Sequence, residues 1–220
     1  MLAAILMSIL ILRLLALTIF FLRSNRDLNH VEYFEGTITY RGDFLRLTNK
    51  YDSIILKAFA GGTTTLYVKD GNYLTVADKG ITTRSLYRKN ENIYYRARFN
   101  SDTVFWTRCD QTGQKILKFT KRAKVERILG IDCDELKVYY QNKTVTYYYN
   151  SDTLKANPDW YKKSTSYHEN FYSREMKAVN LKSIIEYKDF VIIQTAVEIK
   201  QEKLDVSLFE VPNKPLLEDK

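Results

Sequence analysis

The chain has 220 residues, of which 45% are hydrophobic and 14% aromatic, and only 8 are Gly and 3 Pro. This composition supplies a folded core, excludes a disordered polymer and argues against long structureless linkers. The formal net charge of +8 favours anionic partners over cationic ones at the protein surface.

Residues 2–22 are apolar except for Ser8, Arg13 and Thr18. A run of roughly 20 apolar residues can span a bilayer, although Arg13 at its centre costs about 2.5–3.5 kcal/mol on insertion scales. Alternatively, residues 14–22 form the short apolar region of a secretory signal. We expect residues 1–25 to be a signal peptide or an N-terminal membrane anchor, with a buried helix of a soluble domain as a third alternative. Either of the first two exports the protein to the periplasm or cell envelope.

Residues 31–40 alternate in polarity and predict a first strand. The period then changes to three and four, which predicts a helix that Asp43 caps and Gly61-Gly62 ends. Its apolar stripe consists of Phe44, Leu47, Tyr51, Ile54 and Ala58, with Ile55 and Phe59 beside it. We expect this helix to be the principal helix of the fold.

From residue 63 onward the pattern favours strands separated by polar turns, and Asp70-Gly71-Asn72 is the strongest hairpin signal. Further strands are expected at 81–88, 92–99, 103–109, 115–120, 133–140 and 143–149. Their spacing of roughly 10–15 residues is typical of an antiparallel meander.

Residues 151–173 are less regular and predict an ordered loop, our candidate for the mouth or lid of a site. The clearest strand follows, and one of its faces consists of Val191, Ile193, Thr195, Val197 and Ile199. A terminal element is expected at 206–215. We find no internal repeat or composition break, so residues 31–216 are expected to form a single β-rich domain.

The chain contains two cysteines, Cys109 and Cys133. In an oxidising compartment two cysteines are most simply one disulfide, which would contribute roughly 3–4 kcal/mol by the chain-entropy model. Two separate buried thiols are the alternative. We expect no metal site, because His30 and His168 are the only histidines and no zinc spacing is present.

The positive charge is concentrated in residues 79–124, which contain twelve basic and three acidic residues. Basic residues interleaved with aromatic ones are typical of a groove for single-stranded nucleic acid. They are also typical of the solvent face of a cationic sheet. In an exported protein we favour the second interpretation, with attraction to an anionic membrane or polysaccharide as its functional form, and consider a nucleic-acid partner unlikely.

No catalytic or cofactor-binding motif is present: the sequence lacks G-x-S-x-G, a phosphate-binding glycine loop and H-E-x-x-H. Asp132 and Asp134 are the densest carboxylate pair, and they lie on one side of a predicted strand with Cys133 on the other. An enzyme that used them would need both to converge in a cleft with Arg, Tyr or His partners. We expect no enzyme activity and no cofactor.

Several segments together resemble known proteins: an N-terminal leader, FEGTITY at 34–40, ILGIDCDELKVYY at 128–140, TYYYNSDTLKANPDWY at 146–161 and LFEVP at 208–212. This combination resembles uncharacterised exported bacterial envelope β-proteins of the GLPGLI type and, remotely, the lipoprotein-carrier (LolA/LppX-like) superfamily. The resemblance implies a strongly curved antiparallel sheet, an incompletely closed barrel, with a helix on its concave side. It further implies that the concave surface holds acyl chains without covalent chemistry.

We therefore expect a mainly β (α+β) fold, in which a single curved antiparallel sheet or half-barrel carries one principal helix and an N-terminal leader helix precedes it. The expected function is that of a non-enzymatic envelope binding or carrier protein for a lipid, a lipoprotein acyl chain or another amphiphile. A membrane-anchored interaction or assembly module is the alternative. The expected ligand contacts are Phe44, Leu47, Tyr51, Ile55, Trp106 and Trp160.

Overall fold

The structure is a computed structural model that describes residues 32–52 and 62–219. The chain divides into two compact units, Met1–Glu32 and Tyr33–Lys220, and the described strands and helices all lie in the second unit. The expected leader at 1–25 lies outside the described residues. Within the described ranges no helix is both long and apolar enough to cross a membrane.

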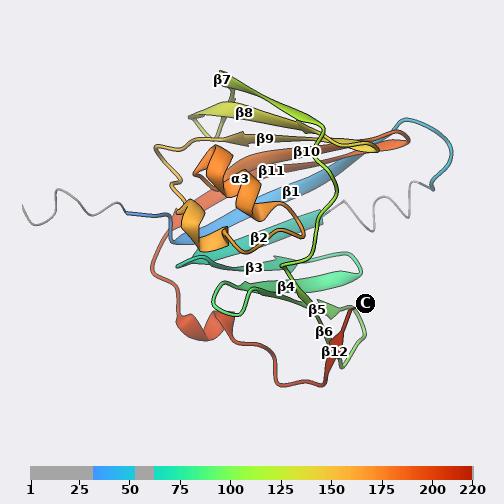
Figure 1. Cartoon of the computed structure of the whole chain (residues 1–220), viewed down its shortest axis with the longest axis vertical. Coiled ribbons are helices and arrows are strands. Elements are labelled where there is room, and N and C mark those ends of the chain that lie inside the picture. Colours follow the sequence, from blue (N-terminus) through green and yellow to red (C-terminus); the bar gives the residue numbers. More distant parts are fainter. Residues whose placement is uncertain (1–31, 53–61, 220) are drawn as a thin grey trace, which may run out of the picture. The chain divides into compact units, whose positions relative to one another are not determined.

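The fold is mainly β, as predicted, and its strands form one open sheet of twelve strands (Figure 1). The strands are β1 (Gly36–Arg46), β2 (Gly62–Lys69), β3 (Asn72–Ala77), β4 (Thr82–Arg88), β5 (Ile93–Arg98), β6 (Val104–Arg108), β7 (Lys118–Ile128), β8 (Ile131–Tyr139), β9 (Lys143–Tyr149), β10 (Asn180–Tyr187), β11 (Phe190–Gln201) and β12 (Leu216–Glu218). Neighbouring strands are antiparallel except for β12, which runs parallel to β6. The sheet is therefore mixed rather than purely antiparallel.

The central strand β1 pairs with β2 on one side and β11 on the other. From β2 the chain moves outward strand by strand to β6, then passes to β7 at the opposite edge and returns through β8, β9 and β10 to β11 (Figure 1). Strands from both ends of the sequence thus lie side by side at the centre of the sheet.

Two tight hairpins illustrate the local chemistry of this sheet. At the predicted turn between β2 and β3, Asp70 has a φ of 50° and Gly71 a φ of 82°. Leu129 and Gly130 have nearly the same angles, 49° and 81°, between β7 and β8. Two successive residues with positive φ match the right-handed twist of paired strands, and glycine tolerates the second position.

The helix expected to begin at Asp43 is wrong for the residues described, because β1 continues in extended form to Arg46. Phe44 pairs with Ile192 and Leu45 with Val191 of β11, so pairing with a long apolar strand overrides the local three-and-four spacing. The remainder of that expected helix, residues 53–60, lies outside the described residues. The α-helix among the described residues is α3 (Glu169–Met176), which is preceded by the 3-10 turn η1 (Pro158–Tyr161).

Helical segments pack on both faces of the sheet. In Figure 1, α3 and η1 lie against the strands at the centre of the sheet. On the opposite face, Leu74, Leu86 and Tyr95 form a cluster with Phe209 of the second 3-10 turn, η2 (Val206–Phe209). The strands at the centre of the sheet therefore have one face covered by α3.

Strand β11 is confirmed, but its expected face is wrong near Val197. Ile38 pairs with Ile199 whereas Tyr40 pairs with Ala196, so one extra residue bulges out of β11 at this point. Ala196 is consequently buried and Val197 is 42% exposed. The bulge reverses the alternation in the middle of the strand.

The predicted disulfide is wrong, because Cys109 and Cys133 are both free and buried. Cys109 directly follows β6 and Cys133 lies on β8, strands near opposite ends of the sheet. The segment between the two cysteines contains strand β7, which pairs along β8. The alternative of two separate buried thiols is the one the structure bears out.

The basic region at 79–124 is divided between the two ends of the strand order, with β4–β6 at one end and β7 at the other. Carboxylates compensate several of its charges. Arg96 and Arg98 contact Asp219 at 3.0 and 2.9 Å, and Arg122 contacts Glu135 at 2.6 Å. This arrangement favours the interpretation of a solvent-facing cationic sheet.

Candidate functional site

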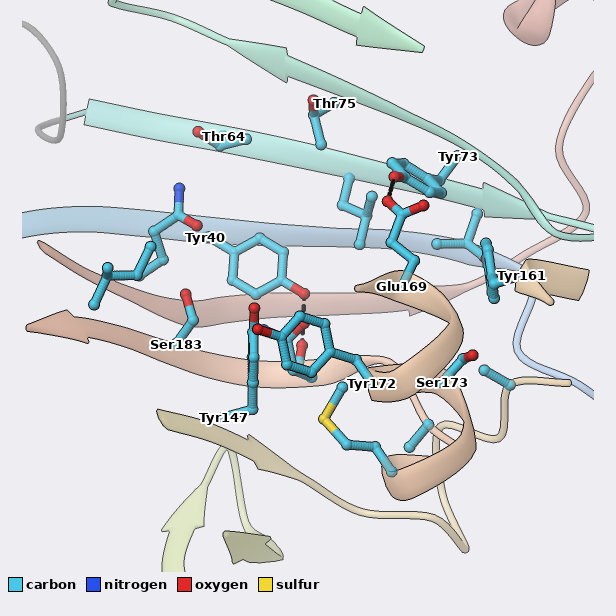
Figure 2. Close-up of a pocket in the computed structure, with 18 residues that line it drawn as sticks. Tyr40, Thr64, Tyr73, Thr75, Tyr147, Tyr161, Glu169, Tyr172, Ser173 and Ser183 are labelled. Atoms are coloured by element: carbon cyan, nitrogen blue, oxygen red, sulfur yellow. Dashed lines mark hydrogen bonds between the residues drawn. The ribbon is translucent and has the colours of Figure 1, made fainter. Parts of the chain in front are cut away.

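A pocket of about 480 Å³ lies between α3, η1 and the centre of the sheet (Figure 2). Its volume is within the range of about 300–1,000 Å³ that is usual for small-molecule sites. Strands β1, β2, β3, β9, β10 and β11 supply one wall, and residues 156–178 supply the other. The aliphatic part of the lining consists of Leu66, Val68, Ala156, Met176, Ala178 and Ile185.

The register of the sheet explains why these side chains share one face. Tyr40 pairs with Thr64, and Ser183 pairs with both Tyr147 and Gln194. Residues that pair directly across neighbouring strands point to the same side of a sheet. All five side chains therefore reach the pocket from adjacent strands.

Five tyrosines line the pocket: Tyr40, Tyr73, Tyr147, Tyr161 and Tyr172. The hydroxyl of Tyr40 donates a hydrogen bond to the Asn180 carbonyl at 2.6 Å. The hydroxyls of Tyr172 and Tyr140 share a hydrogen bond. Burial raises the pKa of Tyr40, Tyr147, Tyr161 and Tyr172 above the usual value of 10.0. These phenols are therefore neutral at physiological pH and can donate or accept hydrogen bonds.

Glu169, the first residue of α3, is the acidic residue of the pocket (Figure 2). The hydroxyls of Tyr73 and Ser164 donate hydrogen bonds to its two carboxyl oxygens. Burial raises the pKa of Glu169 to about 8, because a desolvated carboxylate loses its hydration. At pH 7 the Glu169 carboxyl group is therefore mainly protonated.

The lining contains no lysine, arginine or histidine among the described residues. His168, which precedes Glu169, instead has its ring 5.5 Å from that of Tyr140. Burial lowers the pKa of His168 below 6.5. The pocket thus combines aromatic rings, hydroxyls and amides with one carboxyl group and no cationic partner for it.

The residues predicted to bind ligand lie elsewhere, as far as they are described. Phe44 is on β1 opposite Ile192, Leu47 follows β1 and is 57% exposed, and Tyr51 packs on Phe190. Ile55 lies outside the described residues. None of the three lines the pocket.

The two tryptophans are also outside the lining. Trp106 on β6 packs into the cluster on the opposite face of the sheet, beside Phe209. Trp160 on η1 packs its ring 5.0 Å from that of Tyr33 and against the Lys89 ammonium. Trp160 therefore fixes the position of η1 beside the pocket.

The segment at 151–173, expected to form a mouth or lid, does contribute to the pocket through Ala156, Tyr161, Glu169, Tyr172 and Ser173. Sequence reasoning missed Glu169 itself. The only available signal was a carboxylate among the aromatic residues of that loop, in YHENFY.

Asp132 and Asp134 do not meet the condition for a carboxylate enzyme site. Neither residue lines the pocket. Asp132 is exposed and its carboxylate lies 3.7 Å from Arg127, while Asp134 accepts a hydrogen bond from the Lys124 backbone at 3.0 Å. The pair stabilises the β7–β8 hairpin.

No family model matches the chain, and no curated protein matches it. Among solved structures, PNGF-II has a TM-score of 0.49 at 15% identity over 84% of this chain, and the chain spans only 31% of the length of PNGF-II. LppX of Mycobacterium tuberculosis has a TM-score of 0.34 at 10% identity, covering 78% of this chain and 90% of its own. A LolA superfamily protein from Nitrosomonas europaea has a TM-score of 0.39 at 9% identity, covering 83% and 92%.

These similarities are distant, because each TM-score is below 0.5 and each sequence identity is 15% or lower. The resemblances to the lipoprotein-carrier superfamily and to GLPGLI-type proteins both stay predictions. The class of site is defined by its own geometry: an aromatic pocket between a short helix and the centre of a β-sheet, with one buried carboxyl group.

Proposed function

We propose that this protein is a non-enzymatic binding or carrier protein of the cell envelope that holds a lipid or another amphiphile in the pocket under α3. The observation that carries the proposal is the pocket itself, about 480 Å³ in volume and lined by rings, aliphatic side chains and scattered hydroxyls. Ligand sites typically combine such an apolar surface with a few placed polar groups.

The distribution of chemistry within the pocket favours an amphiphile over a purely apolar chain. Leu66, Val68 and Ile185 offer aliphatic surface, where each buried methylene of a ligand contributes about 0.8 kcal/mol. Ser183 and Gln194 add hydrogen-bonding groups on neighbouring strands. A ligand with both an apolar body and a polar group satisfies both kinds of surface.

Two adjacent threonines of β2 provide a matched test of the site. Thr64 lines the pocket, whereas the preceding Thr63 points to the other face and is exposed. We expect Thr64→Trp to fill the pocket and reduce binding of a fluorescent fatty-acid probe at least tenfold, and Thr63→Trp to leave binding unchanged. Equal binding by both variants would reject the pocket as the site.

Retained ligand and export are tested together by native mass spectrometry of the full chain purified from its own membranes. We expect a bound lipid that is released on unfolding and is absent from Thr64→Trp. The same spectrum gives the mass of the N-terminus, which distinguishes a cleaved signal from a retained anchor at 1–25. Protein that carries no small molecule and binds no amphiphile in titration would contradict the carrier function.

An interaction or assembly module is the second candidate, because two neighbouring apolar side chains are exposed. Ile81 is 54% and Phe99 68% exposed, and the Phe99 backbone donates a hydrogen bond to the Ile81 carbonyl at 2.7 Å. This candidate predicts that Phe99→Ser disrupts co-purification of envelope proteins while Thr64→Trp does not. The carrier function predicts instead that Thr64→Trp reduces amphiphile binding while Phe99→Ser leaves it unchanged.

A further inference from the structure

The carboxyl group of Glu169 lies among aromatic rings inside the pocket. Figure 2 shows it pointing from α3 toward β3, with Tyr40 and Tyr172 to one side of it in this view and Tyr161 to the other. The ring of Tyr73, whose hydroxyl contacts Glu169, lies 6.2 Å from that of Tyr161. Neutral tyrosine rings and a carboxyl group from separate elements therefore converge on one space.

The charge of the lining restricts which polar group a ligand can bring into that space. A buried phosphate or carboxylate needs a cation or several donors to offset its lost hydration. The described lining contains no lysine, arginine or histidine, although the chain as a whole carries a net charge of +8. An anionic headgroup at Glu169 would therefore face a carboxyl group without a compensating cation.

The same lining favours a positively charged group. The faces of tyrosine rings attract ammonium groups within about 6 Å of the ring centre, and quaternary ammonium ligands are commonly bound in such aromatic cages. An ionised carboxylate has about four acceptor sites, and the hydroxyls of Tyr73 and Ser164 occupy two of those on Glu169. Acceptor capacity on Glu169 remains for a ligand.

We propose that the amphiphile bound in this pocket carries an organic cation, an amine or quaternary ammonium group, which lies beside Glu169 among Tyr40, Tyr73, Tyr161 and Tyr172. This inference rests on the proposed function, because it names the class of headgroup that the same pocket accepts. The apolar part of the ligand then lies along Leu66, Val68 and Ile185.

Binding of such a cation is coupled to a proton. Burial raises the pKa of Glu169 to about 8, so below that pH the carboxyl group must release its proton to form the ion pair. The groups that face it are the phenols of Tyr73 from β3, Tyr161 from η1 and Tyr172 from α3, and the hydroxyl of Ser164; Tyr87 of β4 stacks on Tyr73 at 5.1 Å. Burial raises the pKa of Tyr87, Tyr161 and Tyr172 above 10.0, so these phenols are neutral at pH 7.

The experiment uses three surfactants with the same dodecyl chain, each below its micelle concentration: dodecyltrimethylammonium, dodecyl maltoside and dodecyl sulfate. Binding to the full chain is measured by isothermal titration calorimetry. We expect the cationic probe to bind at least about tenfold more tightly than the neutral one, which corresponds to the strength of one charge-assisted contact. General surface electrostatics would give the reverse order, because the protein is basic.

Two variants separate the role of Glu169 from net charge. Glu169→Gln keeps a group that can bond to Tyr73 and Ser164, and we expect it to lose the preference for the cation. Glu175→Gln changes the same net charge on the same helix, but Glu175 lies outside the pocket, where it contacts Lys121 at 3.0 Å. We expect Glu175→Gln to bind as the wild type does.

The pH dependence provides an independent readout. We expect the affinity for dodecyltrimethylammonium to rise by up to about tenfold per pH unit below pH 8 and then to level off, and Glu169→Gln to lack this rise. If all three probes bind equally and Thr64→Trp abolishes their binding, the proposed cationic headgroup is rejected, whereas the carrier function is supported. Failure of every probe to bind would overturn both.

Discussion

Tyr73 on β3 donates a hydrogen bond from its hydroxyl group to the carboxyl group of Glu169 on α3, and this contact joins the sheet to the helix inside the pocket. The Ser164 hydroxyl donates to the other oxygen of the same carboxyl group. Glu169 therefore has a structural role in joining α3 to the sheet as well as the proposed role in binding, and stability measurements can isolate the structural one.

The first prediction concerns the stability of Glu169→Gln as a function of pH. The ordinary pKa of Glu169 is 4.5, and burial raises it to about 8 in the folded protein. Between these pH values the unfolded chain binds fewer protons than the folded one. The free energy of unfolding therefore falls by up to about 1.4 kcal/mol for each unit by which the pH rises. We expect denaturant titrations to show similar stability for both proteins near pH 4.5 and greater stability for Glu169→Gln at pH 8.

The control for this prediction is Glu175→Gln, which removes an ion pair near the protein surface. We expect it to follow the wild-type slope between pH 5 and 8. A wild-type protein whose stability difference from Glu169→Gln does not change with pH would show that Glu169 is already ionised in the fold.

The second prediction compares two glycines with the same backbone conformation. Gly71 and Gly130 have φ values of 82° and 81°, so alanine costs a similar backbone strain at each, about 1 kcal/mol. A Cβ at Gly71 would lie 2.8 Å from Trp160 of η1, whereas a Cβ at Gly130 would meet nothing within 4 Å. We expect Gly71→Ala to destabilise the protein by about 1–2 kcal/mol more than Gly130→Ala, because the new methyl group overpacks this contact.

The readout that identifies the cause is the tryptophan emission of the native state. Displacement of η1 changes the surroundings of Trp160, so we expect the emission to shift in Gly71→Ala and not in Gly130→Ala. Equal stability and equal emission in the two variants would mean that η1 does not pack closely against the β2–β3 turn.

Local signals predicted the sheet well, because hairpins and alternation are encoded by near neighbours. Asp70-Gly71 specifies its own turn, and β9 matches the predicted run at 143–149. Phe44 shows where local signals fail: its helical spacing is real, but pairing of β1 with β11, more than a hundred residues away, determines the conformation. The same long-range pairing creates the bulge at Val197.

The site was harder to predict than the fold for a related reason. Residues 151–173 were predicted to border a site, since a long ordered loop in a small fold usually has a role, and five of them line the pocket. Glu169 was not identified, because an isolated glutamate in a loop is ordinarily solvated. Its burial depends on contacts with Tyr73 of β3 and with Ser164, and no local pattern reports the first of these.

The third prediction concerns the thiols. Burial raises the pKa of Cys109 to about 11 and also raises the pKa of Cys133, so both thiols are protonated and shielded in the native protein. We expect a thiol reagent to label neither cysteine in the folded state and both after unfolding. We further expect a reducing agent to leave the denaturation midpoint unchanged. A protein mass that corresponds to oxidised cysteines, or a denaturation midpoint that falls on reduction, would instead support the disulfide.

The fourth prediction concerns Tyr40, whose hydroxyl crosses from β1 to the Asn180 carbonyl of β10. Tyr40→Phe keeps the ring but removes the hydroxyl that donates to this part-buried carbonyl, which costs about 1–2 kcal/mol. Burial also raises the pKa of Tyr40 above 10.0 in the folded state. The unfolded chain therefore ionises first as the pH rises above 10, and Tyr40 then lowers the stability of the fold by up to about 1.4 kcal/mol per pH unit.

Tyr40→Phe should accordingly be less stable than the wild type at pH 7, with a difference that shrinks or reverses above pH 10. The matched variant is Tyr67→Phe on β2, since the Tyr67 hydroxyl makes no hydrogen bond in the part of the chain that the structure describes and its ring packs on the opposite face of the sheet. We expect it to change stability by less than about 0.5 kcal/mol. A loss in Tyr40→Phe that does not change with pH would show that folding does not shift the pKa of Tyr40. A loss that disappears in alkali instead shows that its buried hydroxyl contributes to holding β1 and β10 around the pocket.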